Sequence, residues 1–356
     1  MASLFIIQGD KSSHPLLCKL PGLLFIALMT VGLLQLAALP SVARMGLGSL
    51  TLAMVGGALL GNTLYPHLQR YCDDGVNWSK HHLLRLGIVL YGFRLSLQHI
   101  AALGISGLII DALVLTSTFL LACYLGKTLL GLDDKTVYLI GAGSSICGAA
   151  AVLATAPTVK AEGDSVAIAV ATVVIFGTIA MFLYPCLYSL AMTGDYLPIS
   201  PQMFGVYIGS TVHEVAQVVA AGHSIAPDVE NTAVISKMLR VMLLAPFLMV
   251  LGGFLQRRTS SGETEKTPMA FPWFAVGFIA VAGFNSLHWL PDTWLTALHQ
   301  IDNLLLTMAM GALGVTTRLS AVRRAGVKPL LLALLLFIWL IVGGAGINVG
   351  ITALLA

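Results

Sequence analysis

The sequence predicts an all-α polytopic membrane protein with about eleven transmembrane helices. Of its 356 residues, 57% are hydrophobic and only 10% are charged, whereas a soluble domain carries about 25% charged residues. Apolar runs long enough to span a bilayer follow one another with short breaks between them. These runs do not alternate apolar and polar residues, as the strands of a membrane β-barrel would.

The predicted domain organisation is simple. Residues 1–20 form a cytoplasmic N-terminal tail, and residues 21–356 form one transmembrane domain, whose longest polar loop is 256–270. Within this domain we place the spans at 21–39, 47–65, 82–98, 103–126, 136–157, 165–191, 202–222, 230–255, 271–290, 299–317 and 329–354.

Lysine and arginine residues in the loops set the predicted orientation. With a cytoplasmic N-terminus, most of these cations face the cytoplasm, and only Arg44, Arg94 and Lys160 lie on the opposite side. The C-terminus is then on the side opposite to the cytoplasm.

Composition also limits which metals, cofactors and macromolecular partners we expect for this protein. The five cysteines are scattered without a CxxC pair, so the sequence suggests neither a zinc site nor a disulfide framework. We expect no metal and no cofactor. The net charge of +3 is explained by the positive-inside bias, and we expect no nucleic-acid partner.

Small and hydroxyl residues interrupt the fifth span. Each glycine weakens a helix by about 1 kcal/mol relative to alanine, and Ser144 and Ser145 are good N-cap residues for a helix that restarts at Ile146. The pattern favours a broken helix whose second half offers an anion its free N–H groups. The alternative is a packing face of small residues. The candidate binding residues here are Gly143, Ser144, Ser145, Cys147 and Gly148.

The seventh span repeats this chemistry with Ser210, Thr211, His213, Glu214 and Gln217. Thr211 and Glu214 fit a Thr-x-x-Glu capping box, so Glu214 either caps a half-helix or takes part in charge coupling. His213 and Gln217 lie four residues apart on one helical face. The string resembles the HExxH zinc motif, but glutamine stands at the second ligand position, which excludes a metalloprotease.

The eighth span carries two cations, Lys237 and Arg240, on one helical face near the membrane midplane. Charged side chains at this depth are costly, and they are usually paired or functional. One of the two cations pairing with Glu214 is the structural alternative to a binding role. Even then one positive charge remains, which an anionic substrate would balance.

Two further polar features leave alternatives open. Arg94 and Asp111 lie in neighbouring spans: Arg94 either snorkels to the interface or pairs with Asp111, and Asp111 is otherwise interfacial. The tripeptide Arg94-Leu-Ser96 recurs as Arg318-Leu-Ser320 after a span of opposite direction. This echo suggests an inverted repeat.

Four motifs, in register over the whole chain, resemble the YeiH-like family of bacterial inner-membrane proteins, which are labelled sulfate exporters. The motifs begin at Leu84-Arg-Leu-Gly, Gly143-Ser-Ser-Ile-Cys-Gly, Thr211-Val-His-Glu-Val-Ala-Gln and Lys237-Met-Leu-Arg. The resemblance groups the chain with cation/proton antiporters and anion transporters. It implies inverted repeats with crossed broken helices, and a core domain that moves against a scaffold by an elevator mechanism.

These observations predict a secondary active transporter that exports a small oxyanion, sulfate or sulfite, coupled to protons or sodium. Lys237 and Arg240 would balance the substrate charge, Glu214 would hold one of them, and His213 would couple transport to protons. The alternatives are a sodium/proton or other cation/proton antiporter using Glu214, and an anion channel. No nucleophile–base pair suggests an enzyme. We expect membrane lipids as partners and a homodimer.

Overall fold

The computed structural model describes residues 17–37, 49–194, 200–258, 273–317 and 326–355, and every regular element in these ranges is helical. The all-α prediction is therefore confirmed for the described residues. Within these ranges, five stretches are long and apolar enough to cross a membrane: Leu20–Ala37, Leu103–Leu129, Gly163–Ala191, Pro227–Leu255 and Val327–Leu355. Most of the predicted tail 1–20, most of the loop 256–270 and the Arg318-Leu-Ser320 echo lie outside the described residues.

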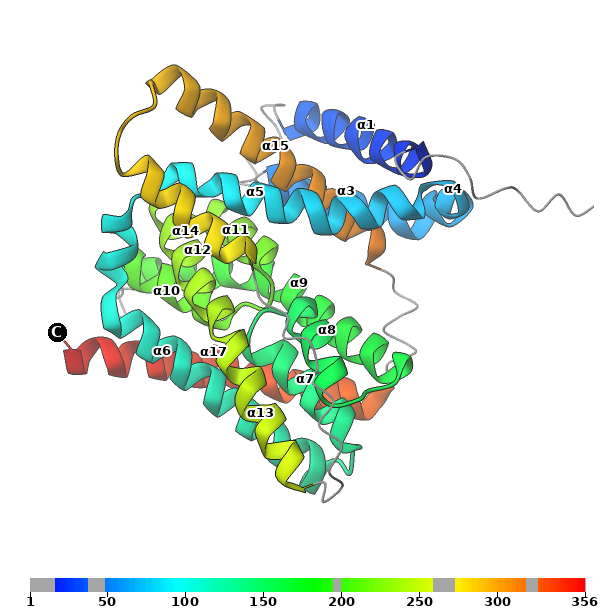
Figure 1. Ribbon diagram of the computed structural model, residues 1–356, viewed down its shortest axis with the longest axis vertical. Coiled ribbons are helices and arrows are strands. Elements are labelled where there is room, and N and C mark those ends of the chain that lie inside the picture. The colour runs from blue at the N-terminus through cyan, green and yellow to red at the C-terminus, as the bar shows by residue number, and fades with distance from the viewer. Residues whose placement is uncertain (1–16, 38–48, 195–199, 259–272, 318–325, 356) are drawn as a thin grey trace, which may run out of the picture.

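One group of helices forms a layer that we name the α3–α15 layer (Figure 1). Gly57 allows α3 and α15 to pack closely, since a Cβ added there would lie 2.3 Å from the Gly311 carbonyl oxygen. The layer contains α1 (Leu20–Ala37) after a 3₁₀ turn (Leu17–Lys19), α3 (Ser49–Thr63), α4 (Tyr65–Trp78), a π-helical segment (Ser79–Leu83), α5 (Leu84–Tyr91) with a 3₁₀ turn (Gly92–Arg94), α14 (Trp273–Asn285) and α15 (Asp292–Thr316).

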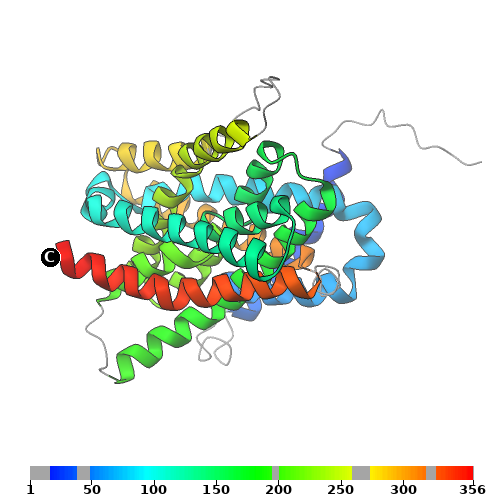
Figure 2. The ribbon, with the colours of Figure 1, turned by 90° about the horizontal axis from the view of Figure 1, so that it is seen from below.

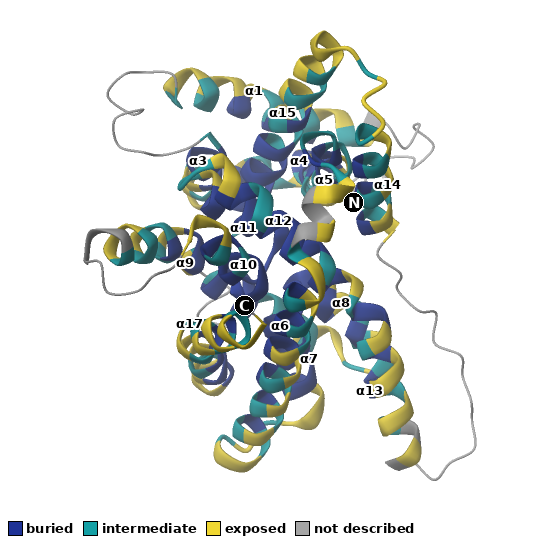
Figure 3. Ribbon diagram, turned by 90° about the vertical axis from the view of Figure 1, so that its left-hand side faces the viewer, coloured by how far each residue is buried: buried dark blue, intermediate teal, exposed yellow. Residues whose placement is uncertain are grey.

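The remaining helices form a second group that we name the hairpin unit. In Figure 2 its last helix, α17, extends along this group with the C-terminus at its far end. In Figure 3 buried residues gather on α10, α11 and α12 at the centre, and exposed residues lie on the outer helices. The unit contains α6 (Leu97–Tyr124) with a π-helical extension (Leu125–Leu129), α7 (Asp134–Ser145), α8 (Ala149–Thr158), α9 (Gly163–Gly194), α10 (Pro201–Thr211), α11 (Val215–His223), α12 (Pro227–Met242), α13 (Leu244–Arg258) and α17 (Val327–Leu355).

The outer faces of these helices are apolar, as a lipid environment requires. Leu28, Ile105, Val250 and Val342 are each more than half exposed. Apolar surface of this extent is uncommon on soluble monomers. The predicted membrane location agrees with this pattern.

The fifth predicted span is a hairpin of α7 and α8 rather than a single crossing. The hairpin begins beside the end of α6, where Lys127 Nζ lies 3.0 Å from Asp134 Oδ2. It ends at Thr158, next to Gly252 of α13. Since Lys127 and Phe254 line one cavity, α6 and α13 end on the same side of the molecule. Both outer ends of the first hairpin therefore lie on that side.

The seventh predicted span is likewise a hairpin, formed by α10 and α11. Near its start, Gly205 packs on Thr232 in the first part of α12. At its end, His223 Nδ1 lies 2.9 Å from Glu230 Oε2, again in the first part of α12. Both outer ends thus lie beside the beginning of α12, on the side opposite to the first hairpin.

The hairpins differ from the predicted spans 136–157 and 202–222 chiefly in direction. The breaks come just after the Gly-Ser-Ser and Gly-Ser-Thr stretches that predict them, but after each break the chain returns to its starting side. This return reverses the direction of α9 relative to the prediction. It moves Lys160, just after α8, to the side on which Lys127 lies, and the positive-inside rule is better satisfied as a result.

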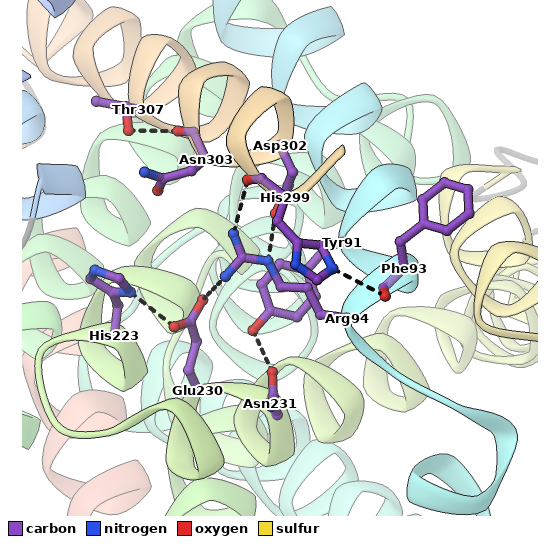
Figure 4. A network of polar contacts seen from close by, with 10 residues as sticks. All are labelled: Tyr91, Phe93, Arg94, His223, Glu230, Asn231, His299, Asp302, Asn303 and Thr307. Atoms are coloured by element: carbon purple, nitrogen blue, oxygen red, sulfur yellow. Dashed lines mark hydrogen bonds and ion pairs between the residues drawn. The ribbon is translucent and has the colours of Figure 1, made fainter. Parts of the chain in front are cut away.

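A polar network joins the α3–α15 layer to the hairpin unit (Figure 4). Arg94 Nε lies 2.8 Å from Asp302 Oδ2 of α15, and Arg94 Nη1 lies 4.0 Å from Glu230 Oε1 of α12. The Tyr91 hydroxyl donates to Asn231 Oδ1 at 2.9 Å. Of the alternatives left open for Arg94, pairing with Asp111 does not hold, because Arg94 pairs with Asp302 instead.

A cysteine in place of Lys160 tests the first hairpin. In a variant without the five native cysteines, a membrane-impermeant thiol reagent should label position 160 from the cytoplasm and not from the periplasm. Cysteines in the 256–270 loop and at the C-terminus, which are predicted to be cytoplasmic and periplasmic, serve as controls. Labelling of position 160 from the periplasm would restore the eleven-span arrangement.

The His223–Glu230 contact predicts a pH dependence of stability. His223 lies at the outer end of the second hairpin, outside the membrane-spanning helices. Its hydrogen bond with Glu230 raises the pKa of its imidazole above the ordinary 6.5, while burial and Arg94 act in the opposite direction. A raised folded-state pKa means that the protonated form stabilises the fold. This contribution is complete below pH 6.5 and is lost as the pH rises through the folded-state value.

Thermal unfolding in detergent below and above pH 6.5 should therefore show the wild type losing stability relative to His223→Gln as the pH rises. The loss should be below about 1 kcal/mol, because solvent screens a side chain that is 35% exposed. An identical pH dependence in the variant would show that His223 does not contribute.

Candidate functional site

The tip of the first hairpin is set by a glycine. Gly148 caps the N-terminus of α8 with φ 68°, a conformation that strongly favours glycine. A Cβ at this position would also lie 2.4 Å from Glu214 Cγ of the other hairpin. The prediction that Ser144 and Ser145 cap a helix restarting at Ile146 is wrong. Both serines belong to the last turn of α7, and the turn at Gly148 delays the restart to residue 149.

The tip of the second hairpin carries a capping box, but three residues later than predicted. α10 ends at Thr211, whose hydroxyl donates back to the Tyr207 carbonyl. Val212 and Glu214 are extended, and Glu214 is the N-cap of α11. The Glu214 N–H donates to Gln217 Oε1 at 3.1 Å. The reciprocal pair is thus Glu-x-x-Gln rather than Thr-x-x-Glu, because Thr211 is still inside α10.

Two fully buried cations of α12 join the tips. Lys237 Nζ donates to the Ile146 carbonyl at 2.7 Å and to the Val212 carbonyl at 2.6 Å, one from each hairpin. Arg240 Nε donates to the Ser145 carbonyl at 2.7 Å. These carbonyls stand at the C-terminal ends of α7 and α10, which carry partial negative charge. The cations therefore neutralise helix ends inside the protein.

Glu214 lies at the N-terminal ends of α8 and α11, which carry partial positive charge. Its Oε1 accepts a hydrogen bond from the Ala149 N–H at 3.3 Å. No ion pair within 4.0 Å joins Glu214 to Lys237 or Arg240 in the described part of the chain. The expected pairing of Glu214 with one of these cations is therefore wrong, because helix carbonyls already occupy both cations.

Several buried polar atoms around the tips have no hydrogen-bond partner among the described residues. Such atoms are uncommon in folded proteins and call for an explanation. Most of them are donors or can act as donors, and their residues are at most 1% exposed. They are Nη1 of Arg240, Oγ of Ser144, Nδ1 and Nε2 of His213 and Nε2 of Gln217.

Ser210 and Thr211, two of the predicted binding residues, contact neighbouring helices instead of the junction. Ser210 Oγ accepts a hydrogen bond from Asn348 Nδ2 of α17 at 3.1 Å. Thr211 Oγ1 accepts one from the Tyr184 hydroxyl of α9 at 2.8 Å. These hydrogen bonds hold α10 against α17 and α9. The contacts therefore support a structural role for both hydroxyls.

Two other predicted residues pack at or near the first tip. Cys147 is buried in the turn between α7 and α8. Gly143 packs so closely that an added Cβ would lie 2.7 Å from Val152 Cγ2 and 2.8 Å from Val173 Cγ1. Gly143 therefore permits the hairpin and its contact with α9.

The structure adds Asp111 to the surroundings of the junction. Asp111 is fully buried in α6, and its Oδ2 lies 3.5 Å from Ser236 Oγ of α12. Ser236 directly precedes Lys237 in the chain. A carboxylate within an apolar run is usually functional. The sequence alone does not predict that the Asp111 carboxylate faces α12 rather than Arg94.

Comparison with known proteins places the chain in a family. Residues 21–333 match the model of a family described as "Conserved hypothetical protein 698". The inner membrane protein YeiH of Escherichia coli (strain K12) is 58% identical over 350 residues, 98% of this chain and 99% of that protein. A membrane protein of Yersinia pestis is 58% identical over 332 residues, 92% of each chain.

A third relative, a membrane protein of Photorhabdus laumondii, is 56% identical over 346 residues, 96% of each chain. No solved structure matches the chain. The family model and these relatives agree with the resemblance carried by the four motifs. The chain belongs to the UPF0324 family of membrane proteins, which includes the inner membrane protein YeiH.

Proposed function

We propose that this protein is a secondary active transporter that exports a small inorganic oxyanion, with sulfate and sulfite as the first candidates. The observation that supports this function best is the set of unpartnered buried donors around two buried cations at the hairpin tips. A tetrahedral or pyramidal oxyanion accepts several hydrogen bonds at once and would satisfy such donors.

The charge at the junction favours an anion when Asp111 is neutral. Each helix end carries about half a unit charge, so the two N-terminal and two C-terminal ends cancel. Lys237 and Arg240 then outweigh Glu214 by one positive charge. Arg240 Nη1, without a partner, is the donor best suited to bind the anion, because a guanidinium binds oxyanions directly.

We further propose nine membrane crossings and two re-entrant hairpins that enter from opposite sides. The opposite directions of α7–α8–α9 and α10–α11–α12 support the predicted inverted repeat. Broken helices near the midplane are the usual place for substrate sites in transporters. The α3–α15 layer would serve as the scaffold, and the hairpin unit would move against it in an elevator-type cycle.

A second candidate function is cation/proton exchange through Glu214. It gains support from one observation, the absence of a cation within 4.0 Å of this carboxylate in the described residues. A carboxylate that is not held by a cation is free to exchange a proton for sodium. The two candidates differ in which ligand stabilises the protein.

Ser144→Ala tests the anion site with little effect on the fold. The Ser144 hydroxyl has no partner among the described residues, so its removal should leave the melting temperature unchanged. If the hydroxyl donates to a bound oxyanion, the loss of about 1 kcal/mol should weaken sulfite binding by about fivefold. Thermal-shift titration with sulfite measures both quantities.

Ser145→Ala is the matched control, because the Ser145 hydroxyl bonds to the Ala142 carbonyl within its own helix, at 3.4 Å. Its sulfite affinity should stay within about twofold of wild type. Equal effects of the two substitutions, or no stabilisation of the wild type by any oxyanion, would remove the support for the site.

Glu214→Gln separates the two candidate functions. In an anion transporter the variant should keep sulfite-dependent stabilisation, and sodium at matched ionic strength should stabilise neither protein. A ligand present at 100 times its Kd raises stability by about 2.7 kcal/mol, which a thermal shift detects readily. If sodium or lithium stabilises the wild type, and Glu214→Gln abolishes that effect while oxyanions do nothing, cation exchange is correct.

A further inference from the structure

Asp111 is a buried carboxylate without an adequate partner. It is 0% exposed, and its Oδ1 has no hydrogen-bond partner among the described residues. Its Oδ2 lies 3.5 Å from Ser236 Oγ, the outer limit of a hydrogen bond. No cation lies within 4.0 Å of it in the described ranges. An ionised carboxylate in such surroundings lacks compensation for its lost hydration.

We infer that Asp111 is a proton-binding site whose protonation is linked to anion occupancy at the junction of the two hairpins. The first half of this inference, the proton site, stands on the burial and contacts of Asp111 alone. The second half, the link, rests on the proposed oxyanion site.

The link is carried by α12. Ser236, Lys237 and Arg240 follow one another within five residues of this helix. Among the described residues, Lys237 and Arg240 of α12 are the charged groups that act on Asp111. Lys237 and Arg240 donate N–H groups to the carbonyls of Ile146, Val212 and Ser145, and these N–H groups are therefore not available to the Asp111 carboxylate. The cations therefore influence Asp111 through their charge rather than through direct bonds.

A cavity of about 430 Å³ lies next to the helix positions of Asp111 and Ser236, and a proton would approach the carboxylate from it. Gln202 and Asp228 at its rim are exposed. Ile110 and Ile235 line it and are the chain neighbours of Asp111 and Ser236. Val206 also lines it, and its carbonyl lies 3.4 Å from Ser236 Oγ. The Ser236 hydroxyl thus stands between the cavity wall and the carboxylate.

Charge fixes the sign of the coupling. A proton on Asp111 neutralises its carboxylate, so that Lys237 and Arg240 attract an anion more strongly. By reciprocity, a bound anion favours the protonated form of Asp111 by the same factor. Proton and oxyanion therefore bind together and move in the same direction. A proton on His213, the predicted coupling residue, would instead add a third positive charge near the same pair.

Infrared difference spectroscopy tests the proton site without any substrate. On acidification the wild type should gain the carbonyl absorption of a buried carboxylic acid, and Asp111→Asn should lose that band. Asp302→Asn, which removes a buried carboxylate of the α3–α15 layer, should keep the Asp111 component. If Asp111→Asn leaves the acid band unchanged, Asp111 is not a proton site.

Ser236→Ala provides a second test of the proton site in case Asp111→Asn does not fold. Among the described residues, it removes the one hydroxyl within hydrogen-bond reach of the carboxylate, and it should shift the pH midpoint of the band without abolishing it. An unchanged midpoint in Ser236→Ala would argue against Asp111 as the source of the band.

Sulfite tests the link separately. Added sulfite should move the midpoint of the Asp111 band to higher pH. Added sulfate, which does not titrate near neutrality, should make the protein take up protons from an otherwise unbuffered solution containing a pH dye. Asp111→Asn should bind sulfate without this uptake. A band that titrates but does not respond to bound sulfite overturns the link alone. A band that titrates in a protein that binds no oxyanion overturns the proposed substrate and leaves the proton site standing.

Discussion

Lys237 is the residue on which the geometry of the junction depends. A hairpin tip inside a membrane protein leaves helix carbonyls without intrahelical partners, and lipid supplies none. The Lys237 ammonium bonds to one such carbonyl from each hairpin, at Ile146 and Val212. Arg240 adds a bond to Ser145. Without these cations the two tips would present partial negative charges and bare carbonyls to each other in a buried space.

Glu214 completes this arrangement with the opposite sign. It stands where α8 and α11 begin, and it accepts a bond from Ala149. Cations thus lie at the C-terminal helix ends and a carboxylate lies at the N-terminal ends, each matching the helix dipoles. Within this one cluster, the groups that hold the hairpin tips are different from the groups proposed to bind the substrate. The N–H groups that hold the tips are occupied, and the donors without a partner among the described residues, on Ser144, His213, Gln217 and Arg240, are the ones that the proposed oxyanion would use.

The sequence predicts local features of this site well and its topology poorly. Gly-Ser-Ser and Gly-Ser-Thr mark both breaks, and the spacing of Lys237 and Arg240 places them on one face. Whether the chain crosses or returns after a break is decided by packing against α6, α9 and α12, which no local pattern encodes. The predicted partners of Glu214 and Arg94 were wrong for the same reason. Each residue was assigned a nearby opposite charge, but helix carbonyls bind Lys237 and Arg240, and Asp302 from a distant segment binds Arg94.

Arg94 makes a short ion pair within one helix group and a longer one to the other group, and this difference suits the proposed movement. Arg94 makes its close ion pair, 2.8 Å long, with Asp302 inside the α3–α15 layer, and only a 4.0 Å contact with Glu230 across the boundary. Sliding the hairpin unit would break the longer contact, the Tyr91–Asn231 hydrogen bond and the hydrogen bond between the Thr51 and Ser224 hydroxyls. The Arg94–Asp302 pair, whose loss would leave the buried Asp302 carboxylate uncompensated, would stay intact. The layer can therefore remain a fixed frame while the junction, with its cations and both hairpin tips, moves as one body.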